Sequence, residues 1–312
     1  MQEKHVHENY KRLEKILNGV GGLDENAIKQ LIVIQAKKLW SKMIGIEDRD
    51  VGMLHDGYLK LFQLSDPDLS GYDYLLVDES QDTNPVTMSI IFKQTAQKVF
   101  VGDSHQAIYG WRGARNALGF AIKQGAVDRY LTGSFRFGSN IAQVANKILA
   151  VKGEPMQVHG LSSTDNIGKA RDGEAKTVIS RSNAGVFSQT AKAINKNQSW
   201  WHVGGSAGYR FEQILDIYHL WKRQFSLVRD PFIRSFTDFA ELKLYAEDVE
   251  DTEIKPRCRI TEEYGDAIPG IIDTIRRQAG AATTMDTAEI VMSTAHKAKG
   301  LEWPNVQLDE DF

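Results

Sequence analysis

The chain has 312 residues, 42% of them hydrophobic and 25% charged, with a mean hydropathy of −0.37. A large folded core is therefore expected and global disorder is excluded. The net charge of −3 excludes a bulk positive field, so binding to a nucleic acid would need a local groove.

The single cysteine, Cys258, excludes an internal disulfide framework and fits a reducing compartment. No stretch approaches the roughly 18 apolar residues needed to span a bilayer, and the polar N-terminus has no apolar signal segment. We therefore expect no membrane partner, and a location in the cytoplasm, or in the nucleus if the source is eukaryotic.

Residues 1 to about 70 are predicted to be helical. From Asp24 to Gly45 the apolar side chains recur on one helical face, and Gly45 can close that helix. The positions on this face are Ile28, Leu31, Ile32, Ala36, Leu39 and Met43.

From about residue 73, short apolar runs alternate with helical stretches, which is typical of a parallel sheet in an α/β protein. The predicted strands are YDYLLV (72–77), KVFVG (98–102), DRYLT (128–132), KTVIS (176–180) and AEIVMS (288–293). Between about 205 and 285 the pattern is helical again. It predicts a helical insertion in an α/β domain that resumes at 288.

The segment YLLVDESQD (74–82) ends an apolar run in two adjacent acids. Asp78 could hold Mg²⁺ through a water molecule, and Glu79 could orient or deprotonate an attacking water. The same segment is also compatible with a strand that runs into an acidic turn. Asn84 and Pro85 then predict the start of a helix.

The segment VFVGDSHQAIYGWRGAR (99–115) ends a second predicted strand and favours the catalytic interpretation. A strand-end glutamine, here Gln106, can bond a γ-phosphate. Tyr109 and Trp111, flanked by Arg112 and Arg115, have the composition of a platform that stacks on single-stranded bases. The alternative, aromatic side chains in a core, fits poorly with a local sequence rich in glycine and arginine.

Together, DESQD and GDSHQAIYGWRGA resemble the second and third conserved motifs of the UvrD/Rep (PcrA-like) superfamily 1 DNA helicases. LTGSFRFGSNIAQVAN (131–146) resembles the fourth motif, and VMSTAHKAKGLEWPNVQL (291–308) resembles the fifth. HKAKGLEW, DEDF and HDGYLKLFQL (55–64) are most similar to the F-box DNA helicase branch, although the chain contains no F-box.

The resemblance implies ATP and Mg²⁺ as cofactors and parts of two RecA-like P-loop NTPase lobes as the fold. The implied limits are 1–125 for the first lobe, 126–204 with 286–312 for the second, and 205–285 for its helical insertion. Single-stranded DNA is the implied substrate, with movement in the 3′ to 5′ direction. Recombination or repair proteins are expected partners.

The resemblance also implies residue roles in ATP hydrolysis. Asp78 would hold Mg²⁺, Glu79 would be the catalytic base, and Gln106 would sense the γ-phosphate. Arg136 would be an arginine finger, a role worth about 10³–10⁵ in rate. The further implied nucleotide contacts are Phe135, in place of the usual tyrosine that stacks on adenine, and Glu302, which would bond the ribose.

The implied DNA contacts lie in the third and fifth motifs. Tyr109 and Trp111 would stack on bases, with Arg112 beside them. In the fifth motif the implied backbone contacts are Thr294, His296 and Lys297, with Lys299 close by. For the two lysines, a solvated surface charge is the open alternative.

A phosphate-binding loop of this class reads G-x-x-x-x-G-K-[ST]. The only Gly-Lys pair is Gly168-Lys169; Ala170 follows it and Ser163 stands where the first glycine is needed. We therefore expect a fragment that lacks this loop and the family's last motif, and that is inactive alone. The alternative is a non-catalytic remnant that binds single-stranded DNA or a protein. The histidine and carboxylate spacing predicts no structural metal.

Overall fold

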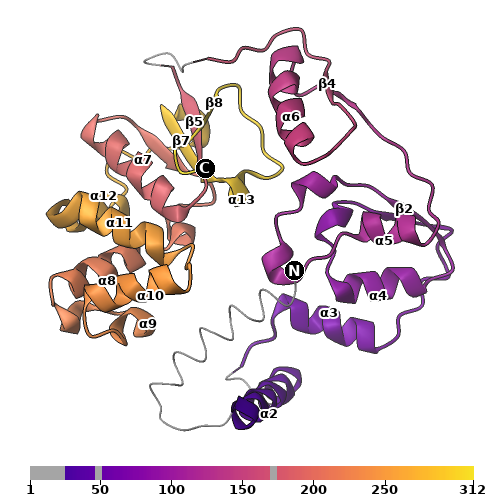
Figure 1. Cartoon of the computed structure of the whole chain (residues 1–312), viewed down its shortest axis with the longest axis horizontal. Helices are drawn as coiled ribbons and strands as arrows, with labels where there is room; N and C mark the ends of the chain where they lie inside the picture. The colour runs from indigo at the N-terminus through magenta and orange to yellow at the C-terminus, as the bar shows by residue number, and fades with distance from the viewer. Residues whose placement is uncertain (1–24, 46–50, 169–173) are drawn as a thin grey trace. The chain divides into compact units, whose positions relative to one another are not determined.

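A computed structural model describes residues 25–45, 51–168 and 174–312, which form two compact units, Met1–Thr132 and Gly133–Phe312 (Figure 1). The expected helical structure before residue 25 lies outside the described residues. Both units mix helices with parallel strands, so the predicted α/β class is confirmed at this level.

The first unit contains a parallel pair of strands with helices before and after each of them. Its elements are α2 (Glu25–Ile44), α3 (His55–Leu64), β1 (Tyr74–Val77), α4 (Pro85–Lys93), β2 (Gln97–Phe100) and α5 (Ala117–Lys123). Helix α4 begins as predicted: Asn84 caps it by accepting from the Thr87 N–H at 2.8 Å, and Pro85 follows.

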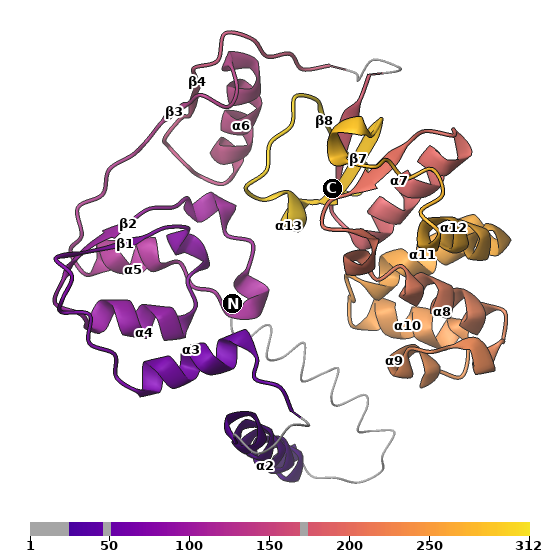
Figure 2. The ribbon, with the colours of Figure 1, turned by 180° about the vertical axis from the view of Figure 1, so that it is seen from behind.

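Helices α4 and α5 pack on one face of the β1–β2 pair, as the two opposite views show (Figures 1 and 2). Phe92 of α4 stacks on Phe100 of β2 at 5.1 Å between ring centroids, and it meets Phe120 of α5 edge-on at 4.7 Å. These aromatic contacts fix the strand ends that carry the candidate site. The opposite face is open, with Leu76 of β1 77% exposed.

The second unit contains a four-stranded parallel sheet in the order β6-β7-β5-β8. Its strands are β5 (Lys176–Ser180), β6 (Trp200–His202), β7 (Ile290–Thr294) and β8 (Val306–Leu308). Strand β7, the last but one in sequence, lies between β5 and β6, so the chain returns to the sheet after the helical segment. The predicted strands at 176–180 and 288–293 are confirmed.

The expected strand at 128–132 is wrong. The chain there is irregular, and a short strand β3 (Gly133–Ser134) follows and pairs with β4 (His159–Gly160). Leu131 is 94% exposed, so the apolar residues of this segment bury nothing that would hold them in a sheet. An apolar run alone does not distinguish a strand from an exposed connection.

The second unit also contains helices, which form most of residues 205–285, as predicted from their periodicity. They are α6 (Ser139–Val151), α7 (Asn183–Asn195), α8 (Glu212–Trp221), α9 (Pro231–Arg234), α10 (Phe239–Asp248), α11 (Ile254–Tyr264), α12 (Ile268–Arg276) and α13 (Ala295–Ala298).

Two apolar clusters hold the helical segment in place. The first joins the sheet and α7 to α8 and α12, and it includes the fully buried Phe187, Ile268 and Met292. Trp200 of β6 is 2% exposed in this cluster. The second cluster lies among α8 to α11 and contains Cys258. The helical segment is therefore continuous with the core of the sheet.

Among the described residues, no helix is both long and apolar enough to cross a membrane. None of them forms a group of three or more side chains suited to bind a metal ion.

Candidate functional site

The two strands of the first unit end side by side and bring the paired acids to one edge of the sheet. Val77 and Phe100 are partners in the parallel register, so Asp78 and Val101 follow at the same level. Glu79 adopts the left-handed conformation, with φ of 49°, and its N–H donates to Asp78 Oδ1 at 2.9 Å. A non-glycine residue held in this conformation costs free energy, which is common at functional sites.

Gln81 links the two strand ends, although it had no role in the sequence-based assignment. Its side chain is 2% exposed, its Nε2 donates to the Glu79 carboxylate, and its Oε1 accepts from the Asp103 N–H at 3.1 Å. A Cβ at Gly102 would lie only 2.2 Å from Gln81 Oε1, so glycine leaves the space for this bridge. The bridge fixes Glu79 relative to the end of β2.

Asp103 organises the end of the second strand. Its Oδ1 accepts from the His105 N–H at 2.8 Å, and its Oδ2 accepts from Gln106 Nε2 at 2.9 Å. Through Gln81 and Asp103, the predicted site residues Glu79 and Gln106 therefore belong to one hydrogen-bonded network. The sequence held no local signal for the Gln81 bridge, because the side-chain oxygen accepts from a backbone N–H of a segment 22 residues away.

Asp82 tethers the loop that carries the predicted stacking residues. Its Oδ1 accepts from the N–H groups of Ile108 and Tyr109, both at 3.2 Å. Tyr109 is half-buried, whereas Trp111 is 64% exposed. The Trp111 ring therefore offers a face to solvent beside the strand-end network. Arg112 lies in the same short helical turn.

The end of β1 offers an exposed carboxylate to a divalent cation. Asp78 is exposed, and its Oδ2 accepts no hydrogen bond from any other described residue. A hard cation such as Mg²⁺ binds carboxylate oxygen and keeps several of its waters. The donor set of one free carboxylate oxygen beside a second acid thus fits the expected ion.

In the second unit, the structure brings Arg136 and Glu302 together. Arg136 Nε lies 2.6 Å from Glu302 Oε2, and the two side chains are 63% and 67% exposed. Phe135, beside the arginine, is 86% exposed. An exposed ring, a guanidinium and a carboxylate therefore lie close together on the surface of this unit.

The residues at the end of β7 differ in where they point. Thr294 is 6% exposed and lies at the end of the strand, while His296 on the following one-turn helix α13 is exposed. Lys297 turns inward, and its Nζ lies 3.6 Å from the centroid of the Tyr209 ring. Burial lowers the pKa of Lys297 from its usual range.

His202 packs against the Tyr209 ring that this lysine covers, and it is nearly fully buried. One ring nitrogen pairs with Thr190 Oγ1 and the other with Ser206 Oγ, both at 2.8 Å. Burial, together with the nearby charge of Lys297, lowers the pKa of His202 to about 3. His202 is therefore neutral at physiological pH and acts as a hydrogen-bonded core residue.

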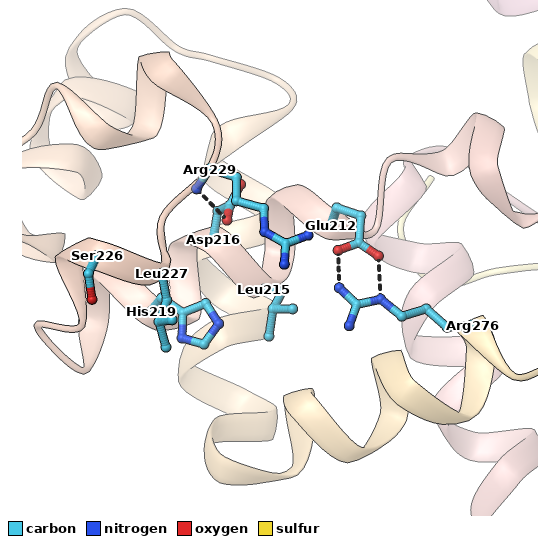
Figure 3. A pocket seen from close by; sticks show the side chains of 8 residues that line it. All are labelled: Glu212, Leu215, Asp216, His219, Ser226, Leu227, Arg229 and Arg276. Atoms are coloured by element: carbon cyan, nitrogen blue, oxygen red, sulfur yellow. Dashed lines mark hydrogen bonds and ion pairs between the residues drawn. The ribbon is translucent and has the colours of Figure 1, made fainter.

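A separate pocket of about 290 Å³ lies in the helical segment and contains none of the predicted site residues (Figure 3). Arg276 and Glu212 close one side with a two-bond ion pair, and Asp216 accepts from the backbone N–H groups of Arg229 and Asp230. These interactions join α8 to α12 and to the segment before α9.

Comparison with known proteins identifies the protein family that the first unit resembles. Residues 50–124 match the UvrD/REP helicase N-terminal domain, the segment that holds both strand ends and the stacking loop. Over this segment the chain is thus similar to the UvrD/Rep helicases.

Two F-box helicases are similar over most of the chain. F-box DNA helicase 1 of Gallus gallus is 35% identical, and F-box DNA helicase protein 1 of Schizosaccharomyces pombe is 30% identical, each across 91% of this chain. The chain covers 29% and 34% of these relatives, so it spans about a third of their length. DNA helicase II of Haemophilus influenzae is 38% identical over 25% of the chain and 12% of its own length.

Proposed function

We propose that the chain is part of an ATP-dependent DNA helicase that moves along single-stranded DNA and separates its strands, in the 3′ to 5′ direction by resemblance. The observation that carries the proposal is the network at the ends of β1 and β2, where Gln81 and Asp103 connect Glu79 to Gln106. A general base and a phosphate-sensing amide in one network suit the hydrolysis of a nucleoside triphosphate.

ATP would supply the phosphoryl group, and Mg²⁺ would neutralise its charge. Asp78 would hold the ion through a water, Glu79 would orient and deprotonate the attacking water, and Gln106 would sense the γ-phosphate. The exposure of Asp78 and Glu79 and their fixed backbone support these roles. The proposed first lobe is 1–125.

The second proposed lobe comprises 126–204 and 286–312, interrupted by the helices of 205–285. Arg136 would stabilise charge on the phosphoryl group, Phe135 would stack on adenine, and Glu302 would bond the ribose. Their exposure and their proximity support these roles. The Arg136–Glu302 pair is able to open for a ligand, because exposed ion pairs are weak.

Single-stranded DNA is the proposed polymer substrate. Tyr109 and Trp111 would stack on bases beside Arg112, and Thr294, His296 and Lys297 belong to the motif that meets the DNA backbone. The 64% exposure of Trp111 and the exposure of His296 support direct contact by these two residues. Recombination or repair proteins are the proposed partners.

The 312-residue polypeptide alone is proposed to hydrolyse ATP weakly or not at all. Its sequence contains no G-x-x-x-x-G-K-[ST] segment, whose amides and lysine grip the phosphates in this class. That same absence favours a second candidate function, a non-catalytic module that binds single-stranded DNA or a protein.

The test measures binding and turnover on the same preparation. Fluorescence anisotropy with a short labelled oligodeoxythymidine should show salt-dependent binding, and ATP turnover should stay at background with or without that DNA. No DNA binding at low salt would reject the DNA-motor assignment. Robust DNA-stimulated turnover would reject both the inactivity and the non-catalytic alternative.

A further inference from the structure

Helix α13 carries two adjacent side chains with opposite environments. His296 is exposed, while Lys297 reaches over the ring of Tyr209, which is 0% exposed, with Nζ 3.6 Å from the ring centroid. Successive residues of an α-helix point about 100° apart, so one residue of this turn faces solvent while its neighbour faces the core.

The lysine lies against two glycines as well as the aromatic ring. A Cβ on Gly208 would lie 2.5 Å from Lys297 Nζ, and one on Gly204 would lie 3.7 Å away. A larger residue at 208 would therefore displace the ammonium. Together, the ring and these glycines form a site, in the segment before α8, that accommodates the lysine ammonium group.

Tyr209 is itself held firmly. Its hydroxyl donates to the carbonyl oxygen of Val203 at 2.8 Å and lies 3.3 Å from that of Met292, and its ring stacks on Phe211 at 5.6 Å. The Tyr209 ring of this site is therefore fixed to β7 and to the apolar cluster of the sheet. A cation above an aromatic face that is removed from water gains about 0.5–2 kcal/mol.

Helix α13 needs such an anchor. It is a single turn, Ala295–Ala298, and no side chain caps its N-terminus. A helix this short has little stability of its own, so tertiary contacts decide its position. A clamp at residue 297 would hold the backbone of residue 296 as well.

We propose that Lys297 is a positioning residue, whose ammonium clamps α13 onto Tyr209 and so holds His296 in place for the DNA backbone. This inference rests on the proposed DNA-binding function, and it replaces the role of direct phosphate ligand that the resemblance implied for Lys297. A lysine that contacts phosphate must direct its ammonium to solvent, whereas this one covers an internal ring.

The clamp is tested first without DNA, by a double-mutant cycle on stability. Lys297→Met should lower the folding equilibrium constant about 2- to 30-fold, the range of a cation above a ring. The same loss should persist in a Tyr209→Phe background, which keeps the ring, and largely vanish in Tyr209→Leu. Lys192→Met, which removes an exposed lysine of α7, is the matched control with little effect. Equal losses in all backgrounds would overturn the clamp.

The positioning role is tested with single-stranded DNA at several salt concentrations. Lys297→Met should weaken binding while leaving the slope of log affinity against log salt unchanged, because no phosphate contact is lost. A direct phosphate ligand would instead reduce the slope by about 0.7. That reduction, or an unchanged affinity, would overturn the role. If the unmutated chain fails to bind DNA, the proposed function fails, whereas the stability cycle still decides the clamp.

Discussion

Arg136 and Glu302 form an ion pair at 2.6 Å although they are 166 residues apart in the chain. Arg136 follows the first short strand of its unit, and Glu302 follows the one-turn helix after β7. The pair therefore joins the fourth and fifth motif-like segments. In the proposed motor, these two segments contact the nucleotide.

Breaking this pair should hardly change stability. Arg136→Ala and Glu302→Ala are each expected to alter the free energy of unfolding by less than about 1 kcal/mol, because both side chains are well exposed and solvent screens them. Urea denaturation followed by circular dichroism measures this. Arg257→Ala is the contrast, since that side chain is only 4% exposed where it pairs with Glu253, and its loss should be larger. A larger effect at Arg136 would mean that the pair is structural.

Removing the Gln81 bridge between the strand ends should lower the stability of the fold. Gln81→Ala is expected to lower the free energy of unfolding by about 1–3 kcal/mol, because it removes a buried side chain and leaves the partly buried Asp103 N–H without its acceptor. The same denaturation experiment measures the loss. Gln97→Ala, an exposed glutamine of the neighbouring strand, should stay within about 0.5 kcal/mol. Equal effects of the two variants would argue against the bridge.

Truncating Trp111 should affect DNA binding and spare the fold. Trp111→Ala is expected to weaken binding of single-stranded DNA by about 1–3 kcal/mol, the value of one base stacked on an aromatic ring. Anisotropy titration measures the affinity. Tyr72→Ala is the matched control, because Tyr72 is also 64% exposed in the same unit but lies outside the stacking loop. Unchanged affinity in Trp111→Ala would remove this ring from the DNA site.

His202 should make the stability depend on pH. Its pKa falls from 6.5 to about 3 on folding, so between these values the unfolded chain binds a proton that the folded chain does not. The stability that the neutral His202 ring contributes to the folded chain is fully present above pH 6.5. It is lost as the pH falls toward 3, at up to about 1.4 kcal/mol per pH unit.

His202→Gln should therefore flatten the dependence of unfolding free energy on pH in that window. Denaturation curves at several pH values between 4 and 7 would show it. His159→Gln, at an exposed position of β4, is the control for the loss of one histidine side chain. A slope unchanged by His202→Gln would show that this ring does not titrate on unfolding.

Periodicity predicted much of the fold, because an element that buries one face repeats its apolar residues at a regular spacing within a short segment of sequence. The strands near 74, 98, 176 and 290 and the helices between 205 and 285 are local patterns of this kind. The prediction of a strand at 128–132 was wrong because a local pattern does not include the partner strand. The run is apolar, but whether a strand forms depends on a partner elsewhere in the chain.

At the strand ends, sequence reasoning singled out Asp78, Glu79 and Gln106 as candidate site residues and gave no role to Gln81 and Asp82. Their roles depend on backbone N–H groups of the neighbouring segment, at Asp103, Ile108 and Tyr109, which only folding brings within reach. A motif shows which side chains are present. It does not show which distant amide completes the hydrogen bond of each.

By itself, the sequence determined the alternation of strands and helices and the motifs that resemble those of DNA helicases, because these depend on the order and spacing of residues. Only the tertiary structure decided that Gln81 bridges two strands and that Lys297 covers Tyr209 while its neighbour His296 faces solvent. The direction of a side chain follows from the partners that folding places around it, and those partners lie far away in the sequence.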